Sequence, residues 1–223
     1  MNPDVVSKGI YLDFEKQIED EKPAIAGVLI DEDYSCFGLD PTLECAVTYL
    51  QSNRVNEEWN FQDANTFAQN ILERAENEER LIIGYTNAER NLLVELTGEQ
   101  VRIDNVYFDA NFSPWFREKY RRTYRRLLRE NRNDSRWRTN RRVGLKDYLS
   151  LDWIGYPYPP DLKNYSPATA LGRMRTEIQS RGGYQNVPRS VKKKFTMIYR
   201  YNFHDCKGMR HLLEFRLSRD SNR

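Results

Sequence analysis

Three short apolar segments within the first 40 residues constrain the fold of this chain more than any other feature. They cover residues 9–15, 24–30 and 34–39, and each has the length of a single β-strand. Asp31, Glu32 and Asp33 form a turn-like sequence between the second and third segments. Because sequential strands with short connections usually pair, the three segments predict an antiparallel three-stranded meander.

Helix and strand patterns alternate after the meander. Apolar residues recur at helical spacing over residues 61–75, and residues 87–96 predict a second helix that stops near Gly98. Short apolar segments at residues 80–85 and 101–108 predict two further strands. The order predicts an α/β fold with a mixed five-stranded sheet flanked by helices.

The second half of the chain is predicted to be rich in helices. The segments with helical patterns are residues 114–128, 143–151, 168–179 and 191–217, the last as one or two helices. No internal repeat and no low-complexity linker interrupts the sequence. We therefore expect residues 1–223 to form a single domain.

Composition excludes several classes of protein. Hydrophobic residues make up 39% of the 223 residues, which is enough for a core and excludes a disordered chain. No segment approaches the roughly 18 apolar residues of a membrane span, and the first ten residues lack a basic stretch followed by an apolar one, so we expect neither membrane association nor a secretory signal. Cys36, Cys45 and Cys206 form no CxxC motif, so we expect no disulfide framework, no zinc ribbon and a cytoplasmic location.

Charge is strongly segregated along the chain although the net charge is only +2. Residues 1–116 hold 23 Asp and Glu against 8 Lys and Arg, whereas residues 117–146 hold 13 Lys and Arg against 3 acidic residues. Residues 173–219 form a second basic segment, with 12 Lys and Arg against 3 acidic residues. Arginine binds phosphate through two hydrogen bonds and aromatic rings stack on unpaired bases, so the pattern favours nucleic acid as a partner over simple solvated faces. Arg121, Arg122, Arg125 and Arg126 recur at helical spacing and are predicted to form one broad positive stripe on a helix. We call these four residues the arginine stripe.

Two carboxylates lie at the end of the first predicted strand. Asp13 and Glu15 are separated by one residue, and because side chains alternate across a strand, both point to the same face. Leu12 and Phe14 then point the opposite way, into the core. Two carboxylates on one face repel each other unless a cation bridges them, so the pair is either a metal site or a solvent-facing edge pair.

The last predicted helix adds a phenol and a third carboxylate. Tyr201 and Asp205 are four residues apart, which places them one above the other on a helix. Such a pair can position a water molecule and a metal ion together. The alternative is that Tyr201 is an ordinary half-buried tyrosine.

Together these motifs resemble those of the DEDD exonucleases, in the tyrosine branch of the ribonuclease-H-like superfamily. The segments YLDFE, LIIGYTNAERNLL, VGLKDYLSL and YNFHDC are similar to ribonuclease-H-like domains attached to helicases or RecB-type nucleases. The resemblance covers residues 9–217. It implies a ribonuclease-H-like fold, 3′–5′ exonuclease activity, and a helicase or another nuclease subunit as a partner. The histidine branch would require His where this chain has Arg200.

The resemblance leaves two candidates for the middle carboxylate. The family usually carries an Asp after a strand, where this chain has Gly84-Tyr-Thr-Asn-Ala-Glu89. Glu89 resembles the acidic residue of the helicase-associated relatives, and Asp109 in VYFDAN is the alternative ligand. Lys16, next to Asp13 and Glu15, also departs from the small residue that is frequent in the family.

The expected chemistry is phosphodiester hydrolysis with two Mg²⁺ or Mn²⁺ ions. Such ions, roughly 3.5–4 Å apart, activate the attacking water and stabilise the leaving 3′ oxygen, and an all-carboxylate site suits them. The resemblance assigns Asp13, Glu15, Glu89 and Asp205 as metal ligands and Tyr201 as the residue that orients the water. The substrate is predicted to be single-stranded DNA or RNA. The alternatives are a nucleic-acid-binding module with little or no activity, and an interaction scaffold.

Overall fold

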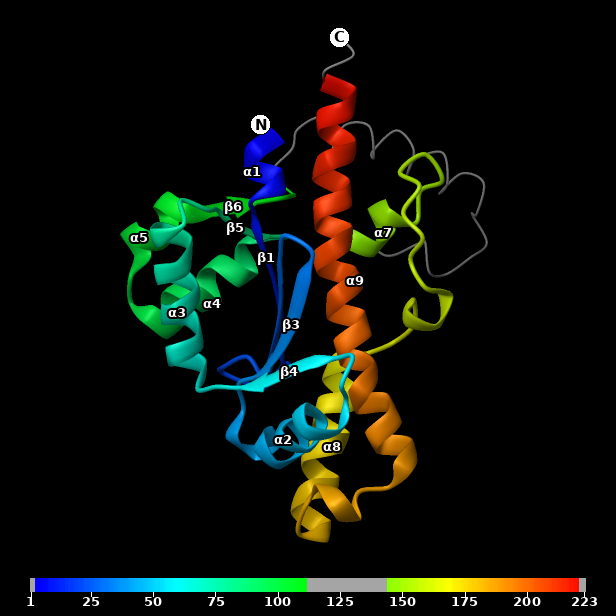
Figure 1. Ribbon diagram of the computed structural model, residues 1–223. Helices are drawn as coiled ribbons and strands as arrows, with labels where there is room; N and C mark the ends of the chain where they lie inside the picture. Colours follow the sequence, from blue (N-terminus) through cyan, green and yellow to red (C-terminus); the bar gives the residue numbers. More distant parts are fainter. Residues whose placement is uncertain (1–2, 112–143, 221–223) are drawn as a thin grey trace.

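The computed structural model describes residues 3–111 and 144–220, and within them it contains a six-stranded mixed sheet (Figure 1). The strand order is β4-β3-β2-β1-β5-β6. The strands are β1 (Ile10–Glu15), β2 (Ile25–Ile30), β3 (Asp33–Gly38), β4 (Glu58–Phe61), β5 (Ile82–Gly84) and β6 (Tyr107–Asp109). The first three are antiparallel, whereas β4 runs parallel to β3, β5 parallel to β1, and β6 parallel to β5.

The predicted meander is confirmed, and its tight turn explains the register. Ile30 pairs with Asp33, so only Asp31 and Glu32 connect β2 to β3. Asp31 adopts a φ of 55°, a left-handed conformation that Asp tolerates better than most residues. In the other ladder of β2, Asp13 pairs with Gly27.

Helices cover the two faces of the sheet (Figure 1). One face carries α3 (Ala64–Asn77), α4 (Asn87–Thr97) and α5 (Gln100–Val106). The other carries the long α9 (Arg189–Asp220), on which α1 (Pro3–Ser7), α7 (Leu145–Leu149) and α8 (Pro167–Arg181) pack, and α2 (Glu44–Asn53) lies against β4. Short 3₁₀ helices occur at Pro41–Leu43, Pro160–Leu162 and Tyr184–Asn186. In residues 3–111 and 144–220, no helix has both the length and the apolar character needed to cross a membrane.

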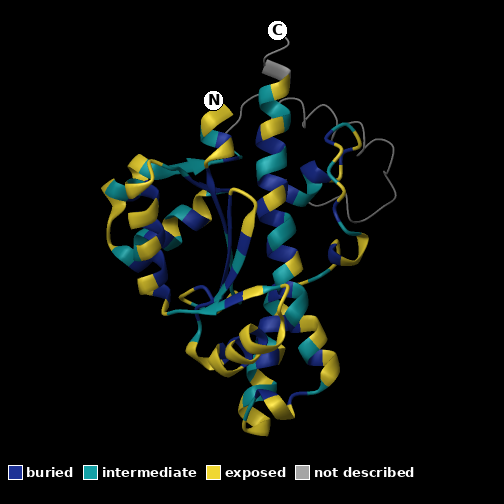
Figure 2. Cartoon of the chain, in the orientation of Figure 1, coloured by how far each residue is buried: buried dark blue, intermediate teal, exposed yellow. Residues whose placement is uncertain are grey.

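Each face of the sheet has its own hydrophobic core, and β1 contributes to both. Ile10 and Leu12 pack toward α3, α4 and α5, and Phe14 is partly buried beside them. Tyr11 belongs to the core beneath α9. Figure 2 shows these inward faces as buried and the outer helix faces as exposed. The alternation therefore places Asp13 and Glu15 on the side of α9, as their spacing predicts.

Several elements differ from the expectations. The predicted strand at 101–108 is wrong for most of its length: Gln100–Val106 is helix α5, and β6 begins only at Tyr107. Ile103 is buried against the α3–α4 side, and its neighbours fit helical spacing as well as alternation. The sheet has six strands rather than five, because β4 extends it beyond β3. The last segment is one continuous helix, and the predicted helix at 114–128 lies outside the described residues.

Candidate metal centre

Three carboxylates from two distant parts of the chain meet where β1 ends. Asp13 and Glu15 come from β1, and Asp205 comes from α9, which crosses β1 and β2. One oxygen of each lies within 4.8 Å of the other two, a spacing that a shared cation would bridge. We call these three residues the acidic triad. Among the described residues, they form the group whose carboxylates could hold a metal ion together.

The charge of the acidic triad is costly without a cation. Burial raises the pKa of Glu15 to about 8 and that of Asp205 to about 6, and nearby carboxylates add to the shift of Glu15. The pKa of Asp13 also lies well above its ordinary value, first because of burial and then because of Glu15 and Asp205. Oδ2 of Asp13 is buried and has no hydrogen-bond partner among the described residues. Neighbouring carboxylates, one of them with an unpartnered oxygen, are the donors that Mg²⁺ and Mn²⁺ prefer, so the residues fit such an ion.

One lysine and one tyrosine contact Asp205 directly, and the sequence analysis identified neither. Tyr158 donates a hydrogen bond of 2.9 Å to Oδ1 of Asp205. The ammonium of Lys146 lies 3.6 Å from Oδ2 of the same residue. Lys146 belongs to α7 and Tyr158 to the loop after it, so both reach the site only because α7 packs on α9. The positive charge of Lys146 and the hydrogen bond from Tyr158 both lower the pKa of Asp205, but burial raises it by more.

Tyr201 lies beside the acidic triad, on the face of α9 that carries Asp205. It is only 9% exposed, and the ammonium of Lys146 lies 3.3 Å from the centre of its ring. The ring of Tyr165 packs against it at a centroid distance of 5.4 Å. Lys146 thus contacts both Tyr201 and Asp205, which confirms that the four-residue spacing brings the two side chains to one face.

Glu89 lies close to the triad, but its carboxylate is engaged at the start of α4. Its Oε2 accepts hydrogen bonds of 3.1 Å from both the backbone N–H and the hydroxyl of Thr86, and so completes a capping box. Glu89 is 9% exposed, and its negative charge still helps to raise the pKa of Asp13. Its predicted role as the fourth metal ligand stays a prediction.

Asp109, the alternative to Glu89, lies at the end of β6. It pairs with Gly84 of β5, and its Oδ1 accepts a 2.8 Å hydrogen bond from the backbone N–H of Asn111. Its charge contributes to the raised pKa of Glu89, so the two carboxylates lie near each other. Both therefore belong to the wider acidic surroundings of the triad.

A close approach of α9 to β2 sets the position of Asp205. Gly27 of β2 has no side chain, and a methyl group there would lie 2.7 Å from Cβ of Asn202. Asn202 is fully buried one helical turn before Asp205, and neither polar atom of its carboxamide has a hydrogen-bond partner among the described residues. The sequence analysis missed this contact, because a glycine in a strand does not indicate which helix will cover it.

Of the two basic segments, the structure describes residues 173–219 but only the last three residues of the segment 117–146. The arginine stripe lies outside the described residues, so its role stays a prediction. In the second segment, part of the charge is structural. Arg175 of α8 forms ion pairs of 2.8 Å with Asp20 and 2.5 Å with Asp40, which tie the segments after β1 and after β3 to α8. Arg210 of α9 is likewise paired, with Glu214 at 2.9 Å.

The acidic triad, Lys146, Tyr158 and Tyr201 thus form one partly buried and asymmetric site at the end of β1. Its negative groups come from β1 and α9, and its single lysine comes from α7. No family model, no curated protein and no solved structure matches the chain.

Proposed function

We propose that this chain is a divalent-metal-dependent nuclease that hydrolyses phosphodiester bonds, with 3′–5′ exonuclease activity on single-stranded DNA or RNA. The observation that carries the proposal is the acidic triad: one oxygen from each of Asp13, Glu15 and Asp205 lies within 4.8 Å of the other two, and Asp205 is buried while the other two residues are half-buried. Placing three negative charges together and partly out of water is unfavourable, and a bound cation would relieve their repulsion.

The order and direction of the strands support a ribonuclease-H-like fold. Strands β3, β2 and β1 form the antiparallel part, and β5 and β6 continue the sheet in parallel on the other side of β1. The D-x-E motif lies on the first strand and Tyr-x-x-x-Asp on the helix that covers it. These are the positions that the resemblance implies for a DEDD exonuclease of the tyrosine branch.

In this proposal the residues of the site divide the work of hydrolysis. Asp13, Glu15 and Asp205 would hold two Mg²⁺ or Mn²⁺ ions, and Glu89 or Asp109 would complete the ligand set. When bound, the ions supply Lewis-acid activation of the attacking water and charge stabilisation at the leaving 3′ oxygen.

Three further side chains assist the carboxylates. The phenol of Tyr201 positions the water, and Tyr158 fixes the carboxylate of Asp205 through its hydrogen bond. The ammonium of Lys146, 3.6 Å from Asp205, offsets part of the negative charge of the carboxylates and of the substrate phosphate. The arginine stripe binds phosphates of the incoming strand without reading its sequence.

The second candidate function is a nucleic-acid-binding module without useful activity. Two observations favour it: Lys146 already provides a cation beside Asp205, and the Oε2 atom of Glu89 is occupied by Thr86. In that case the chain would retain nucleic acid in the absence of metal and would not cut it.

A digestion assay with matched variants tests the proposal. The wild-type chain is incubated with end-labelled single-stranded DNA and RNA in Mg²⁺, Mn²⁺ or EDTA. We expect cleavage that requires metal and is abolished by Asp13→Asn or Asp205→Asn. Asp152→Asn, which alters an exposed carboxylate, serves as the control and should cut like the wild type.

The outcomes separate the candidates clearly. Wild-type turnover by Asp13→Asn in Mg²⁺ would overturn the nuclease proposal. Retention of the oligonucleotide in EDTA with no cleavage in either metal would support the binding module instead. Labelling at either the 5′ or the 3′ end shows the polarity.

A further inference from the structure

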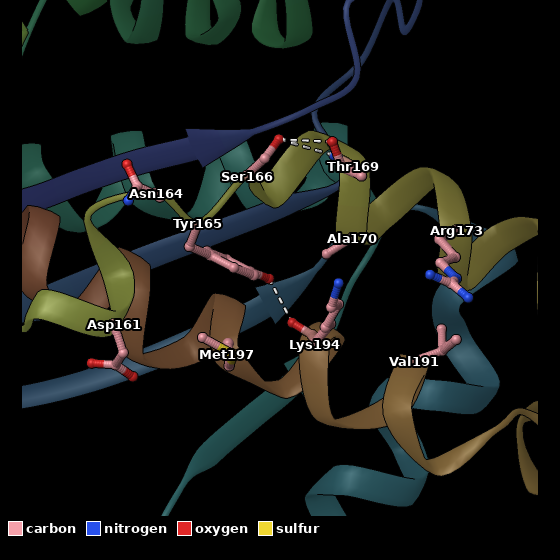
Figure 3. A pocket seen from close by; sticks show the side chains of 10 residues that line it. All are labelled: Asp161, Asn164, Tyr165, Ser166, Thr169, Ala170, Arg173, Val191, Lys194 and Met197. Carbon is pink, nitrogen blue, oxygen red and sulfur yellow. Dashed lines mark hydrogen bonds between the residues drawn. The ribbon is translucent and has the colours of Figure 1, made fainter.

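A cavity of about 360 Å³ lies between the first half of α8 and the first half of α9 (Figure 3). We call it the α8–α9 pocket. Its apolar part is formed by Tyr165, Ala170, Val191 and Met197. Its volume lies within the range of about 300–1,000 Å³ that is usual for small-molecule sites.

Two cationic side chains line the α8–α9 pocket without a counter-ion. Arg173 from α8 and Lys194 from α9 are exposed, and in the described part of the chain neither forms an ion pair. This contrasts with Arg175 on the same helix, which is paired with two carboxylates. The acidic residue of the lining, Asp161, is paired with Arg200 at 3.0 Å. The pocket therefore has a positive charge that an anionic ligand could neutralise.

Polar donors and the start of α8 lie at the same end of the cavity. Ser166 caps the helix by accepting a 3.3 Å hydrogen bond from the N–H of Thr169, and the two hydroxyls are 2.9 Å apart (Figure 3). The helix that begins here has 15 residues, so its dipole favours an anion at this end. Arg173 and Lys194, which form no ion pair within the described residues, line the same cavity, so the cavity offers both cations and a helix start to a phosphate.

The α8–α9 pocket adjoins the acidic triad through one aromatic ring. Tyr165 lines the pocket and packs against Tyr201, with 5.4 Å between the ring centres. The pKa of Tyr165 is raised first by burial and then by the negative charge of Glu15, so its hydroxyl lies within electrostatic reach of the triad. A strand whose scissile phosphate lies at the triad can thus extend into the pocket.

We propose that the α8–α9 pocket binds a nucleoside monophosphate unit of the substrate strand. Arg173 and Lys194 contact its phosphate, and Tyr165 and Met197 contact its sugar or base. The proposal rests on the proposed nuclease function, since it names a subsite for that substrate. An aromatic ring beside unpaired cations is the combination that binds single-stranded nucleic acid without reading sequence.

The test measures ligand binding to the full chain in EDTA, so that it does not depend on metal or cleavage. The probes are adenosine 5′-monophosphate, inorganic phosphate and adenosine. The double variant Arg173→Gln/Lys194→Gln removes the two cations. The matched control, Arg189→Gln/Lys193→Gln, removes two exposed charges from α9 that line a different cavity, beside Tyr49 and Tyr184.

We expect the monophosphate to bind more tightly than either phosphate or adenosine alone. Because charge-assisted contacts to phosphate are among the stronger polar contacts, the double variant, which loses two of them, should bind the monophosphate at least about tenfold more weakly. The control variant should bind it like the wild type. Equal monophosphate affinity in the double variant and the wild type, or no binding in the wild type, would overturn the proposal. Equal affinity for phosphate and the monophosphate would instead indicate a simple phosphate site and reject the nucleotide subsite.

Digestion kinetics separate this proposal from the nuclease proposal. In the double variant, KM for a labelled oligonucleotide should rise about tenfold, as the lost contacts imply, while kcat stays close to the wild-type value. Cleavage with unchanged KM and unchanged monophosphate affinity would reject the pocket and leave the nuclease standing. Monophosphate binding that depends on Arg173 and Lys194, without cleavage in any metal, would reject the nuclease alone.

Discussion

Replacing Gly27 with alanine should damage both the stability of the protein and its affinity for metal. A methyl group at this position would lie 2.6 Å from the hydroxyl oxygen of Tyr34 and 2.7 Å from Cβ of Asn202. Optimal contacts between such atoms are about 3.5–4.0 Å long, so one partner must move by roughly 1 Å. Cβ of Asn202 is one bond from the backbone of α9, and the helix itself must therefore shift away from β2.

The expected magnitude follows from this displacement. Overpacking a core by one methyl group typically costs about 1–3 kcal/mol, and we expect the free energy of unfolding to fall by that amount. Asp205 lies one helical turn beyond Asn202, so the shift also moves its carboxylate away from Asp13 and Glu15. Because Mg²⁺ requires ligand distances of about 2.0–2.1 Å, we expect roughly 10–100-fold weaker metal binding, as for the loss of other groups that orient metal ligands.

The assay compares Gly27→Ala with Gly38→Ala. A methyl group on Gly38 would lie 2.5 Å from Cγ2 of Val47, on the α2 side of the sheet. Urea unfolding in EDTA measures stability, and titration with Mn²⁺ or Mg²⁺ measures affinity. Both variants should lose stability, but only Gly27→Ala should lose metal affinity. Equal metal affinity in the two variants would refute the coupling between the packing of α9 and the acidic triad, and wild-type stability of Gly27→Ala would refute the predicted clash.

Three further predictions concern the charges of the site and its approach. In EDTA, the free energy of unfolding should fall as the pH rises from about 4 to 8. The pKa values of Glu15 and Asp205 in the folded chain, about 8 and about 6, lie above their values in the unfolded chain. The native state therefore binds more protons than the unfolded state in this range and loses stability as the protons dissociate. Saturating Mg²⁺ should remove most of this loss in urea unfolding at each pH, and a pH-independent stability in EDTA would contradict the burial of the triad. Glu89→Gln should abolish cleavage, as Asp13→Asn does, whereas Asp109→Asn should mainly lower stability; the reverse result in the digestion assay would make Asp109 the fourth ligand. Changing the whole arginine stripe to Gln should weaken oligonucleotide binding equally for every sequence and lower the logarithmic salt slope by about 0.7 for each lost phosphate contact; an unchanged slope would place the stripe outside the substrate path.

Local periodicity made much of the site predictable from the sequence. The two-residue repeat of a strand places Asp13 and Glu15 on one face, and the helical repeat places Tyr201 and Asp205 on one face, whatever the rest of the chain does. These relations follow from covalent geometry and short-range hydrogen bonds. The same local argument failed at residues 101–108, since Ile103 fits helix and strand spacing alike and only its packing against α3 and α4 decides the outcome.

Tertiary packing decided which of these faces meet and what surrounds them. Nothing in the sequence around Lys146 or Tyr158 indicates that both contact Asp205, because Tyr158 is 47 residues from Asp205 along the chain and Lys146 is farther still. That contact requires α7 to pack on α9, and the position of α9 requires the close approach at Gly27. Packing against a particular partner depends on the shape and volume of both surfaces, which no single segment contains. Local repeats in the sequence therefore place Asp13 with Glu15 and Tyr201 with Asp205, whereas only the tertiary structure decides that Asp205 joins Asp13 and Glu15, and at what distance and burial.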